Sequence, residues 1–412
     1  MLLSTLLTLA AGAGDHRVPD SIELVSGAKL EGRVVYHEAG ELVLRNGTRD
    51  KAFPMKEVRK VFARAENESE ALLRWFECKP AETIPVLAVA SFCERMDLLE
   101  EANLFRWQVL WIDPHNEEAR SVLGHEQHGG EWGLRQGSAK QWISLTDWAA
   151  AHKDWKSAWE LSSTHYRIKS DLPFRTNADA LLDLECLYYA FFKRCGSALH
   201  SFEVIEPMPV ELHATRDSYP EKIKGRMAYY EPSTNAVYID ASNGLDRGLL
   251  YHEAVHQLLC NSGARDRVQQ GVVPPWLDEG LAEYVRFSMI GPSARPQWED
   301  RFELPVFQRL ARESDGFELS RVLNYALADF DASPKGLTHY AQAYTLVAYF
   351  LRAGGDAYRL RFLDWLRQTY RGKSAPPQFL EALSVDAKTL EAAWKDFVKK
   401  TAGPLPAVPA PR

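Results

Sequence analysis

The sequence has few cysteines, no excess of positive charge and no long apolar run within the chain. Its 412 residues include five cysteines, an odd number with no CxxC pair, which argues against a disulfide framework or a cysteine-built zinc site. The 49 basic and 56 acidic residues give a net charge of -7, so we expect no nucleic-acid partner. No segment reaches about 18 consecutive apolar residues, so none is expected to span a membrane after signal removal. P-loop, GxSxG and dinucleotide-binding motifs do not occur.

The N-terminus differs from the rest of the chain. It reads MLLSTLLTLAAGA without a charge, and Ala11-Gly12-Ala13 has the small residues of a signal-peptidase site. We therefore predict a signal peptide over residues 1–14 and export to the periplasm or the extracellular space. The alternative is a disordered or buried start, because no lysine or arginine precedes the apolar run.

Changes in periodicity along the chain predict an α+β protein with several parts. Residues 18–64 alternate between apolar and polar and contain an Asn-Gly turn, which predicts a small SH3-like β barrel. Residues 66–136 have helical spacing and are expected to form a spacer that is similar to a tetratricopeptide hairpin. The largest region is 141–401, and the Pro- and Ala-rich residues 402–412 are expected to be a disordered tail.

The segment LLYHEAVHQLLC carries the main chemical signal. His252 and His256 are four residues apart, so on a helix they lie on one face and can bind one metal ion. Glu253 is rotated by about 100° from His252, so it flanks the ion as a general base rather than a ligand. The predicted ends of the helix are Ser242 or Asn243 before it and Gly263 after it.

A second helix is predicted in PPWLDEGLAEYV, starting at its two prolines. Its Glu279 is the candidate third ligand, because two histidines and one carboxylate leave a zinc coordination position open for water. Glu283, one turn later, can accept a hydrogen bond from the other ring nitrogen of a ligand histidine. We interpret Asp278 as a solvated charge or a residue of the helix start.

HEAVH followed by PPWLDEGLAEY resembles the gluzincin metallopeptidases, above all the peptidase-MA-like group and its uncharacterised exported members. The resemblance is strongest over residues 251–286 and extends more weakly over 155–400. It implies a gluzincin-like domain of twisted sheet plus helices, with one Zn²⁺ per chain held by His252, His256 and Glu279. It also implies that Glu253 activates water for the hydrolysis of a peptide or protein substrate.

The segment THYAQAYTLVAYF is similar to a helix of aminopeptidase N-like enzymes that supplies a tyrosine to the oxyanion. The matching residue is Tyr340, although Ala343 stands where those enzymes have glycine. His339 is the rival donor and Tyr344 is a poorer one. The alternative is that Tyr340 and Tyr344 belong to the core-facing stripe of an amphipathic helix.

The strand that precedes the HEAVH helix departs from the aminopeptidase pattern. It reads TNAVYIDAS and has no glutamate to bind a peptide amine, so exopeptidase specificity is not implied. We expect the edge of this strand, formed by Ala236, Val237, Tyr238 and Ile239, to bind an extended peptide by strand addition.

Two other functions stay open. The chain can be a catalytically inactive, metal-containing binding or scaffold protein of the cell envelope, in which the N-terminal modules bind a partner. Alternatively, the chain can be a hydrolase that cleaves only itself. Glu253 favours an enzyme, because a pure binding protein has no need of a base. Other histidine-containing segments are interpreted as a loop (124–129) or as surface or core positions (His165 and His213).

Overall fold

The computed structural model describes residues 19–38, 40–137, 141–199, 201–262, 273–290, 295–313, 318–331, 336–371 and 379–405. The predicted signal peptide, Gly263 and residues 406–412 of the predicted tail lie outside this part of the chain. Two compact units divide it: one holds residues up to Tyr189 together with Phe202–Asp246, and the other holds Ala190–Ser201 and Arg247–Arg412. The predicted region 141–401 is therefore divided between both units. None of the described helices is both long enough and apolar enough to span a membrane.

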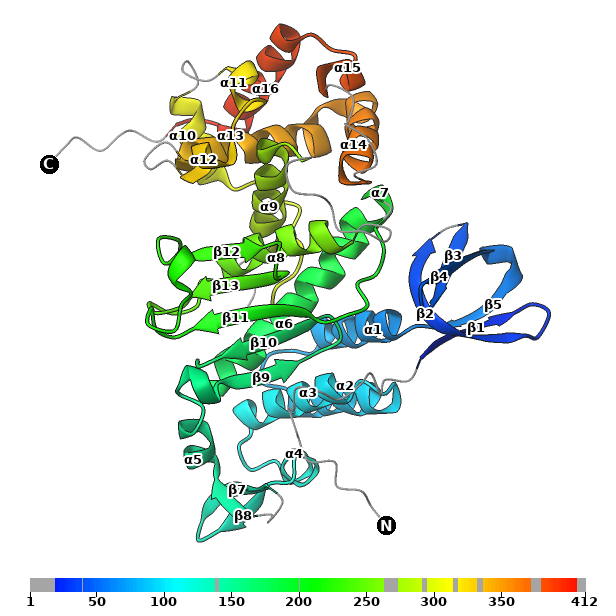
Figure 1. The fold of residues 1–412 in the computed structure, drawn as a ribbon, viewed down its shortest axis with the longest axis vertical. Coiled ribbons are helices and arrows are strands. Elements are labelled where there is room, and N and C mark those ends of the chain that lie inside the picture. Colours follow the sequence, from blue (N-terminus) through cyan, green and yellow to red (C-terminus); the bar gives the residue numbers. More distant parts are fainter. Residues whose placement is uncertain are drawn as a thin grey trace, which may run out of the picture. The chain divides into compact units, whose positions relative to one another are not determined.

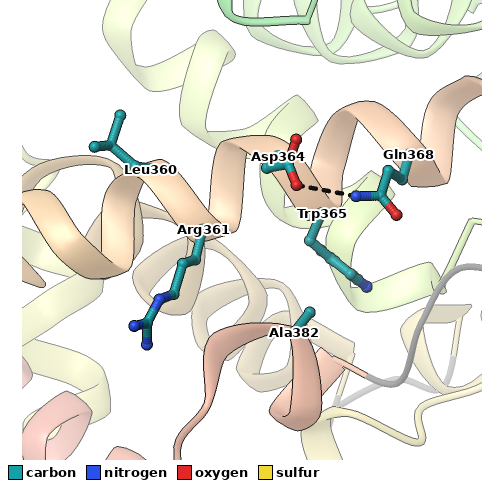
Figure 2. A pocket seen from close by; sticks show the side chains of 6 residues that line it. All are labelled: Leu360, Arg361, Asp364, Trp365, Gln368 and Ala382. Atoms are coloured by element: carbon teal, nitrogen blue, oxygen red, sulfur yellow. Dashed lines mark hydrogen bonds between the residues drawn. The ribbon is translucent and has the colours of Figure 1, made fainter.

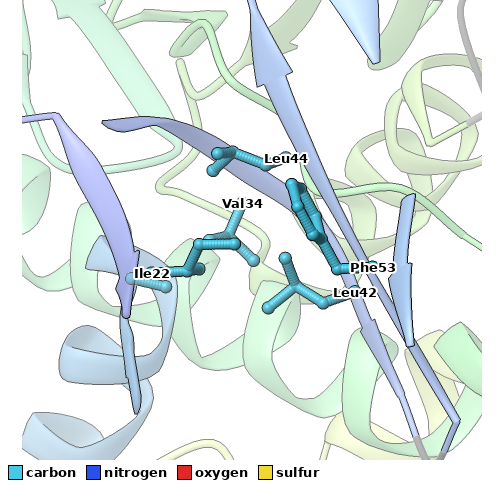
Figure 3. Close-up of a cluster of buried hydrophobic side chains, with 6 residues drawn as sticks. Ile22, Val34, Leu42, Leu44 and Phe53 are labelled. Carbon is cyan, nitrogen blue, oxygen red and sulfur yellow. The ribbon is translucent and has the colours of Figure 1, made fainter. Parts of the chain in front are cut away.

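The first unit begins with five strands, as the alternating pattern predicts (Figure 1). They are β1 Asp20–Leu24, β2 Lys29–Glu38, β3 Glu41–Asn46, β4 Arg49–Pro54 and β5 Val58–Phe62, in the order β4-β3-β2-β1-β5. All neighbours are antiparallel. Their inward side chains, among them Ile22, Val34, Leu42 and Phe53, form one small apolar cluster (Figure 3). Burial of this alternating set holds the sheet in register.

Helices follow the sheet, and then a second sheet that the sequence analysis did not predict. The helices are α1 Arg64–Glu77, α2 Thr83–Arg95, α3 Leu99–Ile112 and α4 Glu117–Val122. The strands are β6 Glu126–His128, β7 Glu131–Gln136 and β8 Gln141–Ser144. The prediction of a helical spacer up to residue 136, with a loop at 124–129, is therefore wrong after α4. Gly129 and Gly130, both with positive φ, make the two-residue turn between β6 and β7.

The third sheet of the first unit also has five strands, in the order β12-β13-β11-β10-β9 (Figure 1). They are β9 Trp159–Ser162, β10 Tyr166–Ser170, β11 Met208–His213, β12 Ala228–Glu231 and β13 Ala236–Asp240, with α5 Leu145–Ala150 and α6 Phe174–Phe191 along the same stretch. The fold class is α+β, since antiparallel and mixed sheets are followed by a helical region.

One site prediction is corrected by this sheet. Strand β13 pairs with β11 on one side and with β12 on the other, so Ala236–Ile239 are on an internal strand. Its backbone groups are already used, and strand addition at Ala236, Val237, Tyr238 and Ile239 is excluded. Every residue of β13 is buried, so its apolar sequence reflects packing on both faces.

The second unit is helical. Its elements are α7 Ser197–Leu199, α8 Arg247–Asn261, α9 Pro275–Met289, α10 Leu304–Arg312, α11 Leu319–Val322, α12 Leu327–Asp331, α13 Gly336–Ala348, α14 Gly355–Arg371, α15 Phe379–Leu383 and α16 Ala387–Ala402. Helix α9 packs against both α8 and α13. These three helices carry the residues that the motifs single out.

Candidate metal centre

Helix α8 supplies the two histidines of the predicted site. It starts at Arg247, four or more residues after the predicted caps Ser242 and Asn243, so neither of these caps it. His252 and His256 lie one turn apart, and their Nε2 atoms are 3.2 Å from each other. Apolar neighbours such as Leu250 and Leu258 are fully buried. They fix this face of α8 against the rest of the unit.

Helix α9 supplies the third candidate ligand. It starts at Pro275, where the fixed φ of proline suits the first helical position. Glu279 Oε2 lies 3.0 Å from His252 Nε2 and 3.5 Å from His256 Nε2. Ligand atoms around a tetrahedral zinc ion are separated by about 3.3 Å, given bonds of roughly 2.0–2.1 Å. The three atoms therefore have the spacing that a zinc ion requires, and this group of residues can hold a metal.

Carboxylates on α9 orient both histidine rings. Glu283 Oε1 lies 2.8 Å from His252 Nδ1, as the motif predicts, and it also accepts a hydrogen bond from Arg286. Asp278 Oδ2 lies 2.9 Å from His256 Nδ1, an ion-pair contact. The hydrogen bond with Glu283 holds the Nδ1 proton of His252 and leaves its Nε2 for the metal. At His256 the charge of Asp278 lies beside Nδ1, but this nitrogen makes no hydrogen bond.

Asp278 lies in the first turn of α9, as one of the two interpretations predicts, but it is not simply a solvated charge. Its other oxygen accepts a hydrogen bond of 2.7 Å from the hydroxyl of Tyr370 on α14. Sequence reasoning missed both residues. Asp278 is adjacent to Glu279 and projects from another face of α9, but the Nδ1 of an imidazole also points away from the Nε2 side. No local pattern could identify Tyr370, which is 92 positions away from Asp278.

A glycine between the acidic residues of α9 lets α13 approach closely. A Cβ atom at Gly280 would lie 2.6 Å from the carbonyl oxygen of Ala343 and 2.8 Å from Val347 Cγ2. These distances are too short for any larger residue. The glycine in WLDEGLAEY is thus explained by packing against α13, the helix that carries Tyr340.

Contacts within the centre shift the pKa values of its histidines and carboxylates. Burial alone would lower the pKa of His252, but hydrogen bonds with Glu279 and Glu283 outweigh it and raise this pKa to about 9. Burial would raise the pKa of Glu279, yet the charge of His256 and the bond with His252 hold it well below its usual range. Glu279 is therefore a carboxylate at neutral pH. Metal binding at these imidazoles must displace a proton.

The two candidate oxyanion donors occupy different surroundings. The ring of Tyr340 lies next to that of His252, with centroids 5.8 Å apart and planes at 74°. The Nδ1 atom of His339 lies 2.7 Å from the carbonyl oxygen of Asp329, and its ring packs against that of Tyr325 at a tilt of 34°. Tyr340 is therefore beside the candidate metal centre, whereas His339 contacts Asp329 on α12 and the ring of Tyr325.

Tyr344 has a structural contact. It is buried, and its hydroxyl accepts a hydrogen bond of 3.0 Å from the backbone N–H of Glu303. Ala341 to Phe350 are all buried, which makes this part of α13 a core helix. Tyr340 is only partly buried, so it is at the margin of that core.

Glu253 follows His252 on α8 and is partly exposed, unlike the buried His252. A separate pocket lies on α14 and α15 and involves none of these side chains (Figure 2). It is lined by Leu360, Arg361, Asp364, Trp365, Gln368 and Ala382. The site residues other than Ala236–Ile239 all belong to the second unit.

Part of the second unit matches a known protein family. Residues 248–371 match a family model described as "Protein of unknown function (DUF1570)". The matched segment includes the two histidines, Glu279 and Tyr340. A search of curated proteins finds no match.

Proposed function

We propose that the chain is a zinc-dependent peptidase of the gluzincin type. The observation that carries the proposal is the convergence of His252 Nε2, His256 Nε2 and Glu279 Oε2 within 3.0–3.5 Å. A bound Zn²⁺ ion would lower the pKa of water to about 7 and polarise the scissile carbonyl. Such a set of three ligands leaves one position open, which is typical of catalytic rather than structural zinc.

The other residues have proton and charge roles in this proposal. Glu253 accepts the proton of the attacking water and delivers it to the leaving amine. Tyr340 donates a hydrogen bond to the oxyanion as negative charge develops there. Glu283 holds the Nδ1 proton of His252, and the charge of Asp278 beside Nδ1 of His256 favours a proton there, so that both Nε2 atoms stay available. We also propose export of the chain, on the basis of residues 1–14.

Cleavage of a peptide library, followed by mass spectrometry, tests this function. Wild type should cleave, and Glu253→Gln should be slower by about 10²–10⁴-fold, the usual contribution of a general base. The matched control is Glu381→Gln on α15, an exposed glutamate of the same unit, which should cleave like wild type. A zinc-loaded wild type that cleaves no peptide would favour the binding or scaffold protein instead.

A further inference from the structure

A second group of potential metal ligands is buried in the first unit. It consists of Glu68 on α1, His165 just before β10, and Glu185 on α6. Their exposed fractions are 2%, 3% and 1%. His165 Nδ1 is hydrogen-bonded to Glu185 Oε2 at 2.7 Å and lies 3.0 Å from Glu68 Oε2. Three elements distant in sequence thus direct an imidazole and two carboxylates to one point.

The group carries more negative than positive charge. Two carboxylates beside one imidazole leave an excess of negative charge even if the ring is protonated, and an uncompensated buried charge is costly. The charge of Arg64 acts on Glu68 from nearby, but this guanidinium is paired with Glu100 and Glu101. Glu203, another buried carboxylate, accepts a hydrogen bond from Tyr188. Compensation must therefore come from an extra proton or from a cation.

Two buried oxygen atoms of this region have no hydrogen-bond partner. One is Glu68 Oε1, in the same carboxylate whose other oxygen contacts His165, and the other is the hydroxyl of Tyr166. Burial and the charges of Glu185 and Glu68 raise the pKa of Tyr166 well above its usual value, so this hydroxyl stays neutral. Buried polar atoms without partners are rare in folded proteins. Oε1 of Glu68 is therefore a ligand atom of this group that no hydrogen bond uses.

We propose that Glu68, His165 and Glu185 bind a divalent transition-metal ion, Zn²⁺ or Mn²⁺, in a second site. One imidazole and two carboxylates form a donor set that both ions accept. The ion takes the place of the proton on His165 Nδ1, and Glu68 uses both oxygens. Ligand separations of 2.7 and 3.0 Å need to open by only about half an ångström to reach metal-site spacing.

The surroundings hold these ligands in place, as the outer contacts of metal sites do. Glu185 Oε1 accepts hydrogen bonds from the backbone N–H of His165 and from the hydroxyl of Ser163. The ring of Tyr188 is stacked on His165, with centroids 3.5 Å apart and planes 10° apart. Since all three ligands are fully buried, the ion would tie α1, β10 and α6 together and would have a structural role.

The test uses the full chain with His256→Ala, which removes a ligand of the first centre. After loading with Zn²⁺ or Mn²⁺ and desalting, elemental analysis should find about one ion per chain. Adding Glu68→Gln should abolish this binding. Adding Glu70→Gln, an exposed glutamate on the same helix, should leave it unchanged.

Anomalous diffraction from metal-loaded wild-type crystals keeps the proposal testable if a variant does not fold. A peak at bonding distance from His165 Nδ1 is expected. Two results would overturn the proposal: absence of that peak, or a folded His256→Ala chain that binds no ion. In either case the group is held together by protons alone. Because the first centre is disabled in the variant, these results are independent of the proposed peptidase function.

Discussion

The protein has two buried groups in which histidine meets carboxylates, one in each compact unit. In the second unit His252, His256 and Glu279 bring their ligand atoms together, and in the first unit Glu68, His165 and Glu185 do so. Both groups are supported by further hydrogen bonds. They differ in their neighbours. The group in the second unit has Glu253 next to His252 in the chain and the ring of Tyr340 against His252. The group in the first unit has Ser163 and the stacked ring of Tyr188.

The difference separates the ability to bind a metal from the ability to use it. Convergent ligands and a source of orientation are enough for binding. Hydrolysis also needs a base near neutral pH, a donor for the oxyanion and an open coordination position. Only the group in the second unit has a partly exposed carboxylate, Glu253, next to a ligand in the chain. We therefore propose catalysis for that group and a structural role for the other.

The largest expected effect distinguishes the two tyrosines that lie against histidine rings. Tyr340→Phe should lower kcat by about 10²–10³-fold with little change in KM, as for the loss of one oxyanion donor. Tyr188→Phe is the matched control: its hydroxyl bonds Glu203 and the N–H of Val204, so it should lower stability and leave kcat unchanged. Steady-state kinetics on a cleaved peptide give kcat and KM of both variants, and chemical denaturation gives their stability. An unchanged kcat in Tyr340→Phe would instead favour the alternative that Tyr340 only belongs to the core-facing stripe of its helix.

The next effect concerns the orientation of His256. Asp278→Asn removes the charge that contacts Nδ1 of this ring, so zinc affinity should fall by about 10–100-fold. Competition with a chromogenic chelator gives the affinity. Tyr370→Phe removes only the hydrogen bond to Asp278 and should have a smaller effect in the same direction. Wild-type affinity in Asp278→Asn would show that the contact plays no part in metal binding.

The next prediction concerns the close packing of α9 against α13 in the second unit. Gly280→Ala places a methyl group 2.6 Å from a carbonyl oxygen, and overpacking of this kind costs about 1–3 kcal/mol. Chemical denaturation should show that loss. Gly225→Ala, in the first unit with open space around it, should be neutral. Equal stabilities of the two variants would contradict the close approach of the helices.

The smallest effect concerns the first unit. Ser163→Ala removes one hydrogen bond to Glu185, which keeps its bond from the backbone N–H of His165, and should cost about 0.5–1.5 kcal/mol of unfolding free energy. Peptide hydrolysis should stay at the wild-type rate, because this group has no part in the chemistry. Parallel unfolding and activity assays separate the two readouts. If Ser163→Ala lost turnover but not stability, the claim that the group in the first unit takes no part in hydrolysis would be wrong.

Local patterns in the sequence were sufficient for the centre in the second unit. Two histidines at i and i+4 define one helical face, and Glu279 follows in a short motif with its own start signal. The structure brings these three candidate ligands together as predicted. The contact of Glu283 with His252 was also predicted from one turn of helical spacing. Helical periodicity is a local property, which is why it could be recognised in one chain.

Features that depend on pairing between distant segments were not predictable in this way. The residues of the first-unit group lie at positions 68, 165 and 185, and His165 was interpreted as a surface or core histidine. Strand β13 looked like a possible edge, but only the observed pairing with β11 and β12 shows that it is internal. The strands β6–β8 were missed because almost none of their residues is buried, so they lack the alternation of buried apolar and exposed polar side chains. Such elements are stabilised by their neighbours rather than by their own pattern.

The most direct test of the central claim is the metal content of three purified full-length proteins: wild type, Glu253→Gln and His256→Ala. Glu253 is not a ligand in our account, so Glu253→Gln should contain as much metal as wild type. His256→Ala should contain one ion fewer per chain, because it loses a ligand of the centre on α8 and α9. Equal metal content in all three proteins, or none in any of them, would contradict the account.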